Sequence, residues 1–117
     1  MATPGEPLEG RYSVVRRLGK GASAVVHEVH DVLTGRRLAL KQLRLAPRLD
    51  PARAERIRLA FRREFHTLVT LEHPHIVAVH DYGVAASGPY YTMELLDAAW
   101  LAGRGAARVE QVLALLR

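Results

Sequence analysis

Short apolar stretches separated by turn-forming residues make up the beginning of the chain. Residues 12–18 and 25–30 are rich in valine and partly alternating, and the glycine-bearing segment 19–23 lies between them. This pattern predicts two strands that form a hairpin with a glycine-rich tip. A turn-like sequence follows at residues 31–35, and residues 37–43 then predict a third antiparallel strand.

The spacing of the apolar residues becomes helical after Asp50. Pro51 suits the first turn of a helix, and Ile57, Phe61 and Leu68 recur along one face. The sequence therefore predicts a long helix that begins at Pro51 and ends near residue 71.

Two further strands are expected over residues 76–84 and 90–96, joined by a turn of small residues that contains Gly-Pro. Together these elements predict an α+β fold, in which a five-stranded antiparallel sheet packs against one long helix. We divide the chain into a flexible leader at 1–10, one domain at 11–97, and a linker with the start of an apolar helix at 98–117.

The composition suits a soluble globular chain. The 117 residues are 49% hydrophobic and 25% charged, which fits one small domain or part of a larger one. Cysteine is absent, which excludes disulfides, thiolate zinc sites and cysteine nucleophiles. The first residues lack the order of a signal peptide and no apolar run is long enough to span a membrane, so we expect a cytoplasmic protein with no membrane partner.

Positive charge is concentrated in and before the predicted helix. The formal net charge is +5, and seven arginines lie between Arg44 and Arg63 against Asp50 and Glu55. Such a segment could bind phosphates or nucleic acid. The simpler interpretation is a solvated helix face, and we expect no nucleic-acid partner because no recognition helix or set of stacking aromatic residues accompanies the arginines.

The glycine-rich tip follows the pattern G-x-G-x-x-G-x-V over residues 19–26, with Ala24 in place of the third glycine. A dinucleotide-binding turn would open a helix, whereas a strand follows here, and the Gly-Lys-Ser/Thr ending of a P-loop is missing. Gly19 and Gly21 would let backbone N–H groups approach phosphate oxygens closely. A plain hairpin turn is the alternative.

Lys41 and Glu64 are charged residues at positions where apolar side chains are expected. Lys41 shares a strand face with Ala39 and Leu43, and Glu64 lies within the apolar stripe of the helix. Packing the helix on the sheet would pair the two charges and leave the lysine able to reach a phosphate. In the alternative arrangement, Glu64 turns toward solvent and Lys41 extends its ammonium group outward.

Three signals thus follow one another: the glycine hairpin, Ala39-Leu40-Lys41, and the helix glutamate that ends Phe61-Arg62-Arg63-Glu64. In this order they resemble the signature set of protein kinases. Residues 71–83 are similar to that family's link from its long helix into the fourth strand, and residues 90–97 to its fifth strand and hinge. The resemblance covers about residues 11–97 and indicates the amino-terminal lobe of a bacterial Hanks-type serine/threonine kinase.

This resemblance implies an ATP site. Adenine would lie between the apolar residues, the glycine backbone would cover the phosphates, and Lys41 would bind both Glu64 and the α/β-phosphates. Met93 matches the gatekeeper position, and the Glu94 carbonyl and the Leu96 N–H would bind the adenine edge. The residues that the resemblance assigns to ATP binding are Leu18, Gly19, Lys20, Gly21, Ala22, Ser23, Ala24, Val26, Ala39, Lys41, Met93, Glu94 and Leu96.

The sequence also lacks motifs of the family. It contains no His-Arg-Asp catalytic loop and no Asp-Phe-Gly motif, so we expect neither a catalytic base nor Mg²⁺ ligands. We therefore expect a kinase fragment without activity of its own, partnered by ATP and by a missing carboxy-terminal lobe or a partner kinase. Self-association would use the apolar helix predicted at 109–117. The alternative is a non-catalytic, pseudokinase-like module that binds a nucleotide or a partner.

Overall fold

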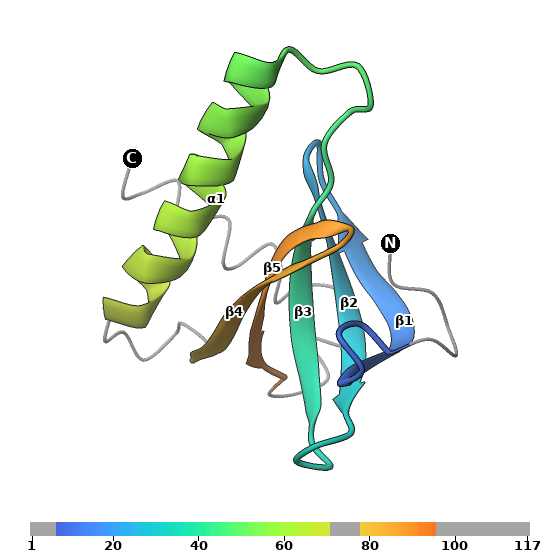
Figure 1. The fold of residues 1–117 in the computed structure, drawn as a ribbon. Coiled ribbons are helices and arrows are strands. Elements are labelled where there is room, and N and C mark those ends of the chain that lie inside the picture. The colour runs from blue at the N-terminus through green and yellow to red at the C-terminus, as the bar shows by residue number, and fades with distance from the viewer. Residues whose placement is uncertain (1–6, 71–77, 96–117) are drawn as a thin grey trace.

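The computed structural model describes residues 7–70 and 78–95, which form one antiparallel sheet and one helix (Figure 1). The strands occur in the spatial order β1-β2-β3-β5-β4. This architecture confirms the predicted five-stranded sheet with a single long helix. The elements are β1 (Tyr12–Lys20), β2 (Ala24–Asp31), β3 (Arg37–Leu43), α1 (Pro51–Thr70), β4 (Val79–Ala85) and β5 (Gly88–Glu94).

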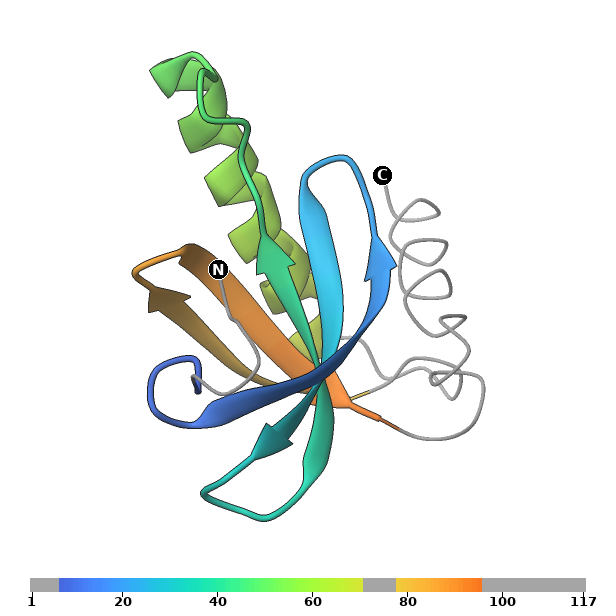
Figure 2. The ribbon, with the colours of Figure 1, turned by 90° about the vertical axis from the view of Figure 1, so that its right-hand side faces the viewer.

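The two hairpins are tighter than the sequence pattern indicated. β1 continues through Gly19 to Lys20 and β2 already begins at Ala24, so the turn between them is reduced to Gly21–Ser23. β5 begins at Gly88, whose φ of 121° is open to glycine and strained for other residues. In both hairpins the ladder pairing continues to the edge of the turn, to Lys20 opposite Val25 in the first and to Ala85 opposite Gly88 in the second. The tip of the β1–β2 hairpin and the β2–β3 turn lie at opposite ends of the sheet (Figure 2).

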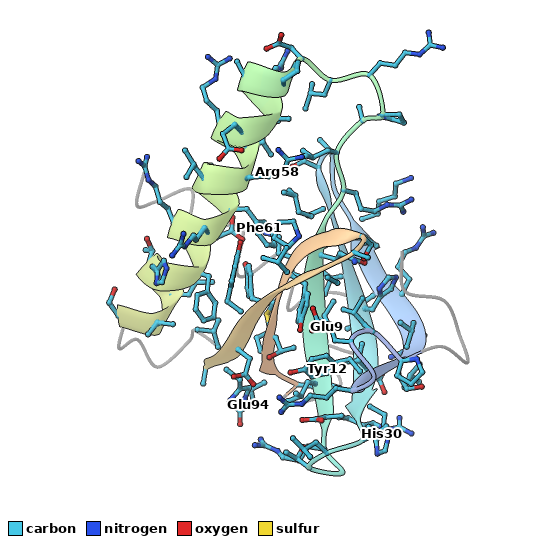
Figure 3. The ribbon with its side chains drawn as sticks, viewed as in Figure 1. Glu9, Tyr12, His30, Arg58, Phe61 and Glu94 are labelled. Carbon is cyan, nitrogen blue, oxygen red and sulfur yellow. The ribbon has the colours of Figure 1, made fainter. Side chains whose placement is uncertain are left out.

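Helix α1 begins where its capping residues predict. The Asp50 carboxylate accepts a hydrogen bond from the Arg53 N–H at 3.1 Å, and the Asp50 carbonyl accepts one from Ala54 at 2.8 Å. Pro51 then occupies the first helical position, where its missing N–H is no loss. Phe61 extends from the helix toward the sheet (Figure 3). The buried residues of α1 are Ala54, Phe61, Phe65 and Leu68.

Apolar clusters cover both faces of the sheet. We call the cluster between the sheet and α1 the helix-side core; it contains Val26, Ala39, Leu43, Phe61, Phe65, Leu68, Tyr91 and Met93. We call the cluster on the opposite face the outer core; it contains Leu8, Tyr12, Val29, Leu38, Leu40 and Tyr90. Strand β3 contributes alternate residues to the two cores and is buried from Leu38 to Leu43. The strand that carries Lys41 is therefore held from both sides.

The segment before β1 packs onto the outer core. We expected a flexible leader over residues 1–10, and the structure describes the chain from residue 7 onward. Leu8 is only 8% exposed, and it exchanges backbone hydrogen bonds of 2.7 and 3.0 Å with Tyr12. Glu9 and Gly10 turn the chain between them with positive φ angles. A single apolar residue among prolines and glycines gave no periodic signal from which this packing could be predicted.

Other expectations fall outside the described residues. These include Leu96, the linker and apolar helix of 98–117, and the link between α1 and β4 at 71–77. Within the described ranges, no helix is long and apolar enough to cross a membrane.

Candidate functional site

A buried ion pair connects β3 to α1. Lys41 Nζ lies 2.5 Å from Glu64 Oε1, and the two side chains are only 7% and 12% exposed. Lys41 faces the helix because it alternates with Leu40 and Gln42 along β3, and Glu64 faces the sheet because it lies one turn from Phe61 and Leu68. The helix-on-sheet packing thus places the two charged residues against each other, and neither side chain extends into solvent.

Tyr91 adds a second hydrogen bond to the same carboxylate. Its hydroxyl donates to Glu64 Oε1, the oxygen that also accepts from Lys41. Tyr91 is directly opposite Lys41 in the pairing of β3 with β5, and it is fully buried. Sequence reasoning missed Tyr91, because β5 is buried on both faces and shows no alternation that separates Tyr91 from Tyr90.

The glycine hairpin lies next to this pair in the sheet. Gly19 is opposite Val26 in the β1–β2 ladder, and Val26 is opposite Lys41 in the β2–β3 ladder. At the tip, the Gly21 N–H donates to the Ala24 carbonyl at 2.8 Å. A Cβ at position 21 would meet only that carbonyl oxygen, at 3.8 Å, so the tip itself is open. The other tip residues, Lys20, Ala22, Ser23 and Ala24, are exposed or half-buried.

The base of the hairpin is anchored to the end of β3. The Ser23 carbonyl accepts a hydrogen bond of 2.7 Å from the Arg44 N–H, and Ala24 pairs with Leu43. These contacts fix the position of the hairpin relative to Lys41 through the backbone alone. The side chains at the tip are therefore not needed for its placement.

An apolar surface continues from Lys41 along the same face. Ala39 is opposite Met93 in the β3–β5 ladder, and both are buried. Val26 belongs to the same helix-side core, and Leu18 packs against it while half-buried. Glu94, at the end of β5, donates its N–H to the Ala78 carbonyl at 2.9 Å. The structure thus brings Leu18, Val26, Ala39 and Met93 onto the face that carries Lys41; Leu96 lies outside the described residues.

A second buried carboxylate lies on this face, directly opposite Ala39 in the β2–β3 ladder. Glu28 is 1% exposed, and it accepts hydrogen bonds from Arg16 at 3.1 Å and from Arg37 at 2.8 Å. Sequence reasoning missed this cluster. The available signal was a glutamate on the same strand face as the apolar Val26, in a sequence where Arg37 opens the following strand.

Asp31 forms a separate ion pair at the other end of the sheet. Its carboxylate accepts two hydrogen bonds of 2.9 Å from the Arg11 guanidinium. Hydrogen bonds from Arg11, together with those from Thr34 and the Leu33 N–H, hold the pKa of Asp31 well below its usual range, although burial opposes the shift. This pair fastens the β2–β3 turn to the start of β1 and takes no part in the candidate site.

The histidines of the described part do not gather around a common point. His27 is buried, and this burial, together with the nearby Arg17 and Arg44, lowers its pKa. Within residues 7–70 and 78–95, no group of three histidine, aspartate or glutamate side chains is placed to hold a metal ion.

Comparison with known proteins relates this geometry to one family. The chain is 42% identical over 97 residues to the DNA damage-responsive serine/threonine-protein kinase RqkA of Deinococcus radiodurans, and 40% identical over 105 residues to the serine/threonine-protein kinase PknB of Mycobacterium leprae. These alignments cover 80% and 86% of this chain, and 14% and 16% of the two relatives. No protein-family model matches the chain.

A solved structure agrees with these relatives. The kinase domain of Mycobacterium tuberculosis PknI superposes with a TM-score of 0.59 at 33% identity, over 83% of this chain and 37% of that domain's chain. The fold, the order of the motifs and the sequence identity therefore all indicate the same family. The chain belongs to the bacterial Hanks-type serine/threonine protein kinases and corresponds to the amino-terminal part of their kinase domain.

Proposed function

We propose that this chain binds ATP on the helix-side face of its sheet, with Lys41 as the phosphate-binding cation. The observation that carries this proposal is the Lys41–Glu64 pair, which is buried beside the glycine hairpin. A buried ammonium held by a carboxylate is oriented before any ligand arrives. A phosphate can then bind to a cation whose position is already fixed.

The residues present fit the nucleotide. The helix-side face carries a small residue, Ala39, between larger apolar residues, which is the pattern of side chains that a flat adenine ring would need. The exposed backbone of the hairpin tip, with an open Gly21, suits close approach to phosphate oxygens. On this proposal adenine lies between Leu18, Val26 and Ala39, with Met93 as gatekeeper. The Glu94 carbonyl and the Leu96 N–H would bind its edge.

Bound ATP would supply a transferable γ-phosphoryl group. The residues of this chain would bind and orient the triphosphate, and Glu64 would keep Lys41 in place. The chain spans about a seventh of the curated relatives that it matches. Transfer to serine or threonine, the use of Mg²⁺, the carboxy-terminal lobe or partner kinase, and a cytoplasmic location are therefore proposals for the whole protein.

Thermal unfolding with and without Mg²⁺–ATP tests the proposal. At ten times its dissociation constant, the nucleotide should stabilise the chain by about 1.4 kcal/mol. For a domain of this size, that gain corresponds to a rise in the midpoint of roughly 5–10 °C. Lys41→Met should abolish most of the rise, because the cation that meets the phosphates is gone.

Arg63→Met is the matched control, since it removes the same charge from an exposed position next to Glu64. This variant should keep the full shift. An equal rise in Lys41→Met would show that ATP binds without Lys41, and the absence of any rise in the unaltered chain would contradict the proposal as a whole.

A further inference from the structure

We propose that Tyr91 is a positioning residue, which holds Glu64 and helix α1 in the orientation that pairs Glu64 with Lys41. Its importance for nucleotide binding rests on the function proposed above. The hydrogen bond itself is a property of the described structure.

The hydroxyl of Tyr91 is placed by the sheet register. Tyr91 pairs with Lys41 across β3 and β5, so both side chains project from the same face toward α1. Lys41 Nζ and the Tyr91 hydroxyl then meet the same oxygen, Glu64 Oε1. One carboxylate is thus held by donors from two neighbouring strands.

The ring of Tyr91 is fixed by aromatic residues of α1. Its centroid lies 5.2 Å from that of Phe61 and 5.6 Å from that of Phe65, with tilted planes in both cases. Tyr91 has no exposed surface. The hydroxyl therefore has little freedom to move away from Glu64, and the helix has little freedom to rotate without breaking this contact.

Two donors on one carboxylate have a consequence for ligand binding. If the Lys41 ammonium group is shared with a phosphate, Glu64 still accepts the hydrogen bond from Tyr91 and is not left as an unsatisfied buried charge. The orientation of α1 then does not depend on whether Lys41 is engaged by a ligand. Tyr91 thus keeps the helix in place whether or not a ligand occupies the site.

Amine acylation of the nucleotide-free chain provides a direct test. The sequence contains only one other lysine, the exposed Lys20, which serves as an internal reference. We would treat the chain with an acetylating N-hydroxysuccinimide ester and measure acetylation of Lys41 relative to Lys20 by mass spectrometry. Tyr91→Phe keeps the ring and removes the hydroxyl. The Lys41/Lys20 ratio should rise roughly three- to tenfold, the equivalent of losing one hydrogen bond, because Glu64 then covers Lys41 less firmly.

Two controls separate this role from general loosening of the fold. Tyr90→Phe removes a neighbouring hydroxyl on the opposite face of β5, and it should leave the ratio unchanged. Phe65→Leu weakens the packing of the Tyr91 ring but keeps the hydroxyl. Urea is added so that the two variants have the same free energy of unfolding. Under these conditions the Lys41/Lys20 ratio should rise less in Phe65→Leu than in Tyr91→Phe. An unchanged ratio in Tyr91→Phe, or an equal rise in Phe65→Leu, would overturn the proposal.

The same variants distinguish this proposal from that of ATP binding. If the unaltered chain gives no thermal shift with Mg²⁺–ATP, the proposed function fails, yet the acetylation ratio still decides the role of Tyr91. If ATP does bind, the dissociation constant should rise in Tyr91→Phe and stay unchanged in Tyr90→Phe. An unchanged dissociation constant for ATP in Tyr91→Phe would contradict the part of the proposal that concerns the nucleotide.

Discussion

At the scale of single residues, the carboxylate of Asp31 shows how a buried charge can organise a turn. It is 1% exposed and accepts hydrogen bonds from Arg11, from the Thr34 hydroxyl and from the Leu33 N–H. Each of these donors stabilises the ionised form, which lowers the pKa of Asp31. The turn between β2 and β3 is therefore tied to a group that must stay ionised.

We expect a pH dependence of stability that originates at this residue. Because the pKa of Asp31 is depressed in the folded state, its contribution is present above the unfolded value of about 3.9 and is lost as the pH falls toward the lower folded value. Asp31→Asn should lower the free energy of unfolding at pH 7 by about 2 kcal/mol. The free energy of unfolding of this variant should then fall less between pH 5 and pH 2 than that of the unaltered chain. Urea unfolding across this range measures both effects.

Asp81 offers a matched control for Asp31. It lies 3.7 Å from the same Arg11 guanidinium, but its side chain is 54% exposed. Asp81→Asn should change the free energy of unfolding by less than about 0.5 kcal/mol. Equal losses in the two variants would show that burial and multiple hydrogen bonds give Asp31 no special weight.

At the scale of elements, the pairing of β4 with β5 depends on one glycine. Gly83 is opposite Tyr90, and a Cβ at position 83 would lie 2.5 Å from the Tyr90 hydroxyl oxygen and 2.6 Å from the ring carbon that bears it. The tyrosine ring thus lies over the glycine. Tyr90 belongs to the outer core, so it cannot move away without disturbing that cluster.

Gly83→Ala should therefore destabilise the chain by roughly 1–3 kcal/mol, the range typical of overpacking. In the Tyr90→Leu background the same change should cost clearly less, because the colliding atoms are gone. A double-mutant cycle in urea measures this coupling. Val84→Ala, at a position that is 67% exposed, is the control with little expected effect. Additive losses at positions 83 and 90 would contradict the steric argument.

The elements also show which parts of the site the sequence could reveal. Glu64 could be found because α1 is amphipathic, so a carboxylate within its apolar stripe stands out. Lys41 could be found as a charge within an apolar strand. Tyr91 could not, since a strand that is buried on both faces lacks the alternation that assigns residues to a face. Its role depends on the register between β3 and β5, which is set by contacts distant in sequence.

At the scale of the whole molecule, the sheet lies between two apolar clusters, and only one of them includes the helix. The helical spacing of Ile57, Phe61 and Leu68 predicted the face of α1 that packs on the helix-side core. The outer core depends on Leu8 and Tyr12, which come together through a turn at Glu9 and Gly10. Positive φ angles at consecutive residues leave no hydrophobic pattern, so the packing of Leu8 against Tyr12 could not be predicted from the sequence.

The outer core leads to the last prediction. Leu8 packs against a cluster that includes Leu38 and Leu40 on the back of β3, so it supports the strand that presents Lys41 without lying in the site. Leu8→Ala should lower the free energy of unfolding by about 2–3 kcal/mol with an unchanged denaturant m-value. Leu33→Ala, at a position that is 74% exposed, should have almost no effect. If the two variants unfold at the same urea concentration, residues 7–10 lie outside the cooperative unit, and β3 is held by the remaining residues of the two cores alone.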